Sequence, residues 1–252
     1  MDEGILEFLR VLIMAREKTK FVESLSNIYS GEEIWILGSG KSLDDFPNNF
    51  FDDKISIGLN GAIYKFPECT WWHGHHEVWR EYFRDERPDM LPKCIVCYPM
   101  PGPFHHGYII DPVEFFGDMT SIPYWLYFRD NTVLKKEEFY NPIKEIVAKK
   151  RKVAFRCSAS VVHIAIQIAF LMGAGKITLA GCEHKTYAGL SSHAGEGELK
   201  KKIEPWCVWG NRSLVAEATV WLSEVLVDQG VDVKRYFNSD TEFYKKGYVE
   251  VV

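Results

Sequence analysis

Short apolar runs and longer helical patterns alternate along most of the chain. Runs of apolar and β-branched residues bounded by polar or glycine-containing links predict buried strands. Such runs lie at 34–37, 54–60, 69–73, 93–98, 176–184 and 231–238. Stretches with helical spacing of their apolar residues lie at 3–28, 75–86, 143–152, 158–175 and 213–230. This alternation predicts an α/β fold, with a mainly parallel sheet and helices on both faces.

The same pattern predicts how the chain is divided. We expect residues 1–30 to form an N-terminal helical segment and residues 31–252 to form a single α/β domain. Two long polar stretches, 99–123 and 185–210, interrupt this domain. Loops of this length are often functional, and a lid that orders over a nucleotide and excludes water has this character. A solvated loop is the equally favoured alternative.

Composition narrows the class of protein. The net charge of −5 argues against a general nucleic-acid binder, which needs a basic surface. Several of the six cysteines lie inside apolar runs, as expected of a reduced cytosolic protein and not of a disulfide framework. The acidic start "MDEG" is unlike a signal peptide. We therefore predict a cytoplasmic protein, free or at the inner membrane face.

The apolar segment near the N-terminus bears on that localisation. "ILEFLRVLIMA" is interrupted by Glu7 and Arg10 and is too short to span a bilayer. We expect residues 3–28 to pack on the body of the protein. A membrane surface or a second copy of the chain are the alternative partners.

The stretch "IWILGSGKSLDDF" contains G-K-S after an apolar run, as a P-loop does. A P-loop would need a glycine at position 35, which is Trp35, and the dinucleotide-binding motif would need one at Leu43. What remains is a strand, a tight glycine-rich turn and a polar helix start with Ser42 as a candidate N-cap. Such a turn is able to point N–H groups at an anion, and a plain strand-to-helix turn is the alternative.

Polar residues follow four of the predicted strands. Ligands of parallel sheets bind at the carboxyl ends of the strands, so these side chains are expected to converge. They are Gly38, Ser39 and Gly40, then Asn60 and Gly61, then His73, His75 and His76, and then Gly181, Cys182, Glu183 and His184. The histidine cluster suggests zinc, but adjacent residues do not all point one way, so no metal ligand is predicted. Cys94 and Cys97 are expected on a strand, which disfavours a zinc knuckle.

Three segments carry a resemblance to a known family. "WILGSGKSLDDF", "SIGLN" and "CSASVVHIAIQIAFLMGAGKITLAGCEH" resemble the bacterial lipooligosaccharide sialyltransferases. They also resemble the related flagellin glycosyltransferases and archaeal-type 6-hydroxymethylpterin diphosphokinases. The resemblance covers roughly residues 33–75 and 150–240. It implies a Rossmann-like fold that binds a CMP-linked sugar and transfers the sugar to a glycan hydroxyl.

The resemblance also implies site residues. Those expected to contact the nucleotide or its sugar are Gly38, Ser39, Gly40, Ser42, Asn60, His73, Ser158, Ala159, Ser160, Gly181 and Cys182. Arg156 matches the family arginine before the small-residue helix start, whereas Lys41 stands where proline is usual. The family's catalytic histidine is absent from "WCVWGNRSL". His193 in the preceding loop is the candidate replacement.

Glycosyl transfer needs a base for the acceptor hydroxyl and a group that stabilises the leaving phosphate. The candidate bases are His193, His184 and Glu183, and the candidate cations are Arg156, Lys185 and Arg212. The reaction requires no cofactor.

Two alternatives stay open. Glu183 follows a strand where the diphosphokinase relatives carry a magnesium-binding acid, so a Mg²⁺-dependent diphosphokinase is the second hypothesis. The absent histidine favours a third, a nucleotide- or sugar-binding protein without catalysis.

Overall fold

A computed structural model describes residues 22–74, 85–99, 122–127, 136–150, 153–156, 160–182, 212–236 and 250–251. These residues form a nine-stranded sheet in the order β6-β5-β4-β3-β2-β1-β7-β8-β9, and every neighbouring pair is parallel. The strands are β1 (Glu33–Leu37), β2 (Ser56–Leu59), β3 (Trp71–Gly74), β4 (Cys94–Pro99), β5 (Ile122–Tyr127), β6 (Ala154–Arg156), β7 (Lys176–Ala180), β8 (Asp232–Tyr236) and β9 (Glu250–Val251). The prediction of an α/β fold with a mainly parallel sheet is confirmed.

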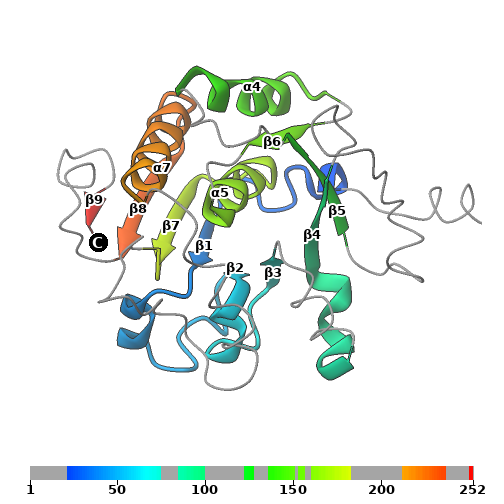
Figure 1. Ribbon diagram of the computed structural model, residues 1–252, viewed down its shortest axis with the longest axis vertical. Helices are drawn as coiled ribbons and strands as arrows, with labels where there is room; N and C mark the ends of the chain where they lie inside the picture. The colour runs from blue at the N-terminus through cyan, green and yellow to red at the C-terminus, as the bar shows by residue number, and fades with distance from the viewer. Residues whose placement is uncertain are drawn as a thin grey trace, which may run out of the picture.

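Three α-helices pack together on one face of this sheet. They are α4 (Lys136–Val147), α5 (Val161–Leu171) and α7 (Arg212–Val227), and Figure 1 shows α5 in the centre with α4 along the top. Successive side chains of β1 point to opposite faces of the sheet, as they do in any β-strand. Ile34 and Ile36 face the core shared with α5 and α7, whereas Trp35 and Leu37 face the other side.

The opposite face is covered, over β1 and its neighbours, by 3₁₀ turns and an aromatic cluster. The turns are η2 (Lys41–Asp45) and η3 (Asn60–Tyr64). Trp35 contacts the edges of three phenylalanine rings here, at centroid distances of 5.4 to 6.1 Å. Two further 3₁₀ turns are η1 (Val22–Leu25) and η4 (Pro88–Lys93).

Some predicted elements differ from the structure. The helix expected from residue 143 is α4, which begins at Lys136 and runs through Pro142. The prediction that it begins after Pro142 is wrong because Phe139 and Ile143 are both buried, and this packing outweighs the cost of an internal proline. The predicted loop 99–123 overlaps β4 at Pro99 and β5 at 122–123.

Residues 1–21 of the N-terminal segment, most of the predicted helix 75–86 and nearly all of the two lid-like loops lie outside the described residues. Where the predicted N-terminal helix is described, it is the short 3₁₀ turn η1 followed by turns, so its expected end at residue 28 is wrong. Cys94 and Cys97 both lie on β4, as predicted. Among the helices that the structure describes, none has the length and apolar character needed to cross a bilayer.

Candidate functional site

Two turns meet at the centre of the carboxyl edge of the sheet. The β1 turn comprises residues 38–42, and the β7 turn comprises Gly181 and Cys182. Gly38 N–H donates to Ala180 C=O at 2.7 Å, and Gly40 N–H donates to Gly181 C=O at 2.8 Å. The pairing of β1 with β7 therefore continues past the last residue of each strand.

The two turns approach each other so closely that both need glycine. A Cβ on Gly38 would lie 2.1 Å from the carbonyl oxygen of Gly181, and one on Gly181 would lie 2.6 Å from that of Gly38. Gly181 also has φ +66°, a conformation that disfavours other residues. β1 connects to β2 on one side while β7 connects to α7 and β8 on the other. The turns thus lie at the topological switch point, where ligands of such sheets bind.

Ser42 joins the two turns and does not cap a helix as predicted. The N-cap residue of η2 is Gly40, and Ser42 lies one residue inside that turn. Its Oγ instead accepts a hydrogen bond from Gly181 N–H at 3.1 Å. The N–H groups of Gly38 and Gly40 are bonded to protein carbonyls, so they do not face an anion as expected. Anion binding by the rest of this turn stays a prediction.

Asn60 lies at the carboxyl end of β2, beside the β1 turn in strand order. It opens η3 with φ +46°, and its backbone carbonyl accepts a hydrogen bond from Trp72 Nε1 at 3.0 Å. Its side-chain Oδ1 is buried and has no hydrogen-bond partner among the described residues. A buried amide oxygen without a donor costs roughly 1–3 kcal/mol, a cost that a donor from a ligand or an ordered water would offset.

His73 and Cys182 are more deeply placed than a ligand-contacting side chain requires. His73 is 0% exposed on β3, in register with Leu59 and Ile95. Cys182 is 2% exposed and belongs to the core cluster, and its Sγ lies 3.8 Å from the carbonyl oxygen of Ile36. A ligand at this edge would meet the backbone of Cys182, not its thiol.

Arg156 and Ser160 flank the link from β6 to α5. Arg156 ends β6, the edge strand, so four strands separate it from β1. Ser160 is the N-cap of α5, and its Oγ accepts a hydrogen bond from Val162 N–H at 3.3 Å. Because α5 contacts β6, β3, β2 and β1, this helix connects the edge strand with the centre of the sheet.

Several predicted site residues lie outside the described part of the chain. These are Ser158, Ala159, Glu183, His184, Lys185 and His193. Arg212 begins α7, but its side chain is not described. The roles assigned to these residues stay predictions. Among the residues that are described, no group of three or more histidine, cysteine or acidic residues has the geometry of a metal site.

His163 is a buried core residue on the apolar helix α5. Its Nε2 lies 3.0 Å from Thr219 Oγ1 and 3.1 Å from Val215 C=O. Thr219 donates its own hydroxyl proton to Val215 C=O at 2.9 Å, so Nε2 carries the ring proton and donates it. Burial lowers the pKa of His163 to about 4, against a smaller opposing effect of the Val215 carbonyl. The ring is therefore neutral at pH 7.

Sequence reasoning missed Gln167, which is fully buried on α5 and bonded to the backbone of Arg156. The available signal was a single amide in the apolar run "HIAIQIAF". Such a residue needs hydrogen-bond partners inside the core.

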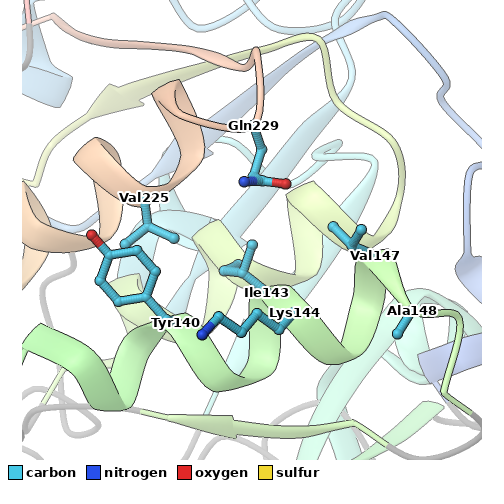
Figure 2. A pocket seen from close by; sticks show the side chains of 7 residues that line it. All are labelled: Tyr140, Ile143, Lys144, Val147, Ala148, Val225 and Gln229. Carbon is cyan, nitrogen blue, oxygen red and sulfur yellow. The ribbon is translucent and has the colours of Figure 1, made fainter.

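A pocket formed by described residues lies elsewhere. An apolar groove of about 210 Å³ lies between α4 and the last turns of α7. Figure 2 shows the side chains that line it. Its lining residues are Tyr140, Ile143, Lys144, Val147, Ala148, Val225 and Gln229. Since α7 ends where the chain turns back into β8, this groove lies towards the amino ends of the strands, away from the β1 and β7 turns.

Comparisons with known proteins add little to this site. No family model matches the chain. No curated protein matches it either. A solved structure that is similar is the sialyltransferase CstII from Campylobacter jejuni, in complex with the substrate analogue cytidine-5'-monophosphate. The identity is 14%, the TM-score is 0.49, and the match covers 88% of this chain and 85% of that chain. A likeness at this level carries no argument about activity, so the function is argued from this chain's own residues.

Proposed function

We propose that this protein binds a CMP-type nucleotide sugar at the carboxyl edge of β1, β2 and β7 and transfers the sugar to a glycan hydroxyl. The support is the sequence resemblance together with the geometry of that edge. The β1 and β7 turns lie at the switch point of a parallel sheet, which is the usual place for a nucleotide.

The observation that carries the proposal is that Asn60 Oδ1 is buried and has no hydrogen-bond partner within the part of the chain that the structure describes. This acceptor is buried at the end of the strand next to β1, so it needs a donor that arrives with a ligand. Ribose hydroxyls and the amino group of cytosine are donors of this kind.

The transfer step is assigned to residues around the two links that follow β6 and β7. Arg156 stabilises the charge that develops on the leaving phosphate. His193, His184 or Glu183 accepts the proton of the acceptor hydroxyl as the new glycosidic bond forms. No metal ion is required, because the positive charge needed at the phosphate is supplied by a side chain.

The test is a thermal-shift panel on the pure protein with CMP, CDP, UDP, GDP, ATP and CMP-sialic acid, each with and without magnesium. A ligand that binds only the native state raises the midpoint, by an amount set by its concentration relative to Kd. We expect a rise with CMP compounds that does not depend on magnesium. A rise with ATP and magnesium alone would support a diphosphokinase instead.

Asn60→Gly separates a ligand contact from a structural role. Glycine tolerates the positive φ and removes the buried, unpartnered oxygen, so the variant should unfold at the same midpoint as the wild type or higher. CMP should nevertheless bind it at least tenfold more weakly, as expected when about 1.4 kcal/mol of hydrogen bonding is lost. An unchanged affinity in Asn60→Gly would remove Asn60 from the site.

A further inference from the structure

The side-chain amide of Gln167 is bonded to the backbone of Arg156, eleven residues earlier in the chain. Its Oε1 accepts from Arg156 N–H at 3.1 Å, and its Nε2 donates to Arg156 C=O at 2.7 Å. The second hydrogen of Nε2 is donated to His163 C=O, also at 2.7 Å. Gln167 is 0% exposed, so the oxygen and both N–H groups of a fully buried amide are engaged.

This arrangement compensates for the position of β6 at the edge of the sheet. Among the described strands, β6 pairs only with β5, and an edge strand leaves backbone groups without a strand partner. A primary amide presents a carbonyl and an N–H side by side, as a peptide group does. At Arg156, a residue of helix α5 therefore takes the place of the missing neighbouring strand.

The same helix also holds the other end of the link that follows β6. Ser160 caps α5 through the bond from Val162 N–H to its Oγ. Only residues 157–159 lie between Arg156 and Ser160. The link is thus fastened to α5 at both ends, once through Gln167 and once through the cap.

We propose that Gln167 is a positioning residue for the nucleotide-sugar site. It fixes Arg156 relative to Ser160 at the start of α5, so that these two residues meet the phosphate and sugar in one arrangement. This inference rests on the proposed function, in which those residues contact the nucleotide sugar. A group that is already oriented binds without a further ordering cost, which is the advantage that the Gln167 bonds provide.

The core around Gln167 supports a role beyond packing. Ile164, Ile166 and Ile168 on the same helix are all 0% exposed, so the position lies in an apolar environment. An apolar side chain such as methionine would fill the same volume there without needing partners. The amide is therefore explained by what it bonds, and its two bonds to the chain outside its own helix both go to Arg156.

The experiment measures the dissociation constant of CMP-sialic acid by calorimetry, at a temperature where every variant is folded. The variants are Gln167→Met, Arg156→Ala and the double variant. Thr219→Val is the matched control, since it removes a buried hydroxyl that is bonded to His163 and Val215 in the core. Urea unfolding is recorded for each variant, so that losses of stability and of affinity are separated.

We expect Gln167→Met to weaken binding about tenfold, as the loss of a well-placed charge-assisted hydrogen bond does. In the Arg156→Ala background the same change should weaken binding by less than threefold, because there is no longer a side chain to position. Thr219→Val should lower stability and leave the dissociation constant within twofold of the wild type.

Gln167→Glu provides a rescue that a purely structural residue would not show. A protonated carboxyl keeps one acceptor and one donor, whereas the charged form places negative charge against the carbonyls of Arg156 and His163. The affinity of Gln167→Glu for CMP-sialic acid, divided by that of the wild type at the same pH, should rise as the pH is lowered. The Gln167→Met ratio should stay constant.

The outcomes are distinct. Gln167→Met with wild-type affinity and lowered stability would overturn the positioning role while leaving the proposed function intact. An equal loss in the wild-type and Arg156→Ala backgrounds would also overturn it. A wild-type protein that binds no CMP compound would refute the proposed function, and this inference with it.

Discussion

His163 makes the stability of this protein sensitive to acid. The ring is completely buried, its Nε2–H is donated within the core, and burial lowers its pKa from 6.5 to about 4. The unfolded chain therefore binds a proton between pH 6.5 and pH 4, whereas the folded protein does not. The contribution of His163 to the free energy of unfolding is fully present above pH 6.5 and is lost as the pH falls towards 4. At about 1.4 kcal/mol for each pH unit, the loss reaches about 3 kcal/mol.

Urea unfolding at a series of pH values from 7 to 4 tests this. His163→Gln is the reference, because glutamine keeps a donor for Val215 C=O and Thr219 Oγ1 but does not titrate in this range. The free energy of unfolding of the wild type relative to His163→Gln should fall by about 3 kcal/mol from pH 7 to pH 4. Carboxylates shared by both proteins cancel in this difference. A difference that is independent of pH would refute the reasoning.

Three further predictions concern the sheet and its turns. Gly38→Ala should cost at least about 3 kcal/mol of unfolding free energy, because its Cβ would lie 2.1 Å from a backbone oxygen. Gly230→Ala is the control: open space surrounds Gly230 and its φ is +81°, so this change should cost only about 1 kcal/mol. Urea unfolding of both variants compares the two costs. Ser42→Ala should cost about 1–2 kcal/mol by the same assay, because the N–H of Gly181 loses its acceptor. A cost near zero would show that water replaces the hydroxyl. Burial raises the pKa of Glu33, but the hydrogen bond and charge of Lys176 and the bond from Thr178 outweigh it and leave the pKa lowered. Stability from this group is present above pH 4.5 and lost below it, so Glu33→Gln should cost less than about 1 kcal/mol at neutral pH and less still in acid, as thermal melts would detect.

The elements that were predictable are those whose signal is local. β1, β2, β4 and β8 are apolar runs between polar links, and each lies within two residues of its predicted position. β7 begins at residue 176 as predicted but ends at Ala180, four residues before the predicted end. β5 was missed because Pro123 within "IPYWLY" is atypical of a strand inside a sheet. β6 is only three residues long and is completed by its pairing with β5 and by Gln167, which no local pattern reveals.

The candidate site was predictable as a location and less so as a set of contacts. Parallel strands alone imply that Gly38, Asn60 and Gly181 share one edge. The use of the Gly38 and Gly40 N–H groups within the protein depends on how closely the β1 and β7 turns pack, which is a tertiary property. The positive φ of Asn60 is likewise fixed by its surroundings, including the bond from Trp72 to its carbonyl.

A calorimetric titration of CMP into the wild-type protein and into Asn60→Gly, both in EDTA, tests the central claim most directly. The account predicts saturable binding by the wild type without magnesium, and at least tenfold weaker binding by a variant that is equally or more stable. No binding by the wild type at millimolar CMP, or equal binding by both proteins, would contradict a nucleotide site at the carboxyl end of β2.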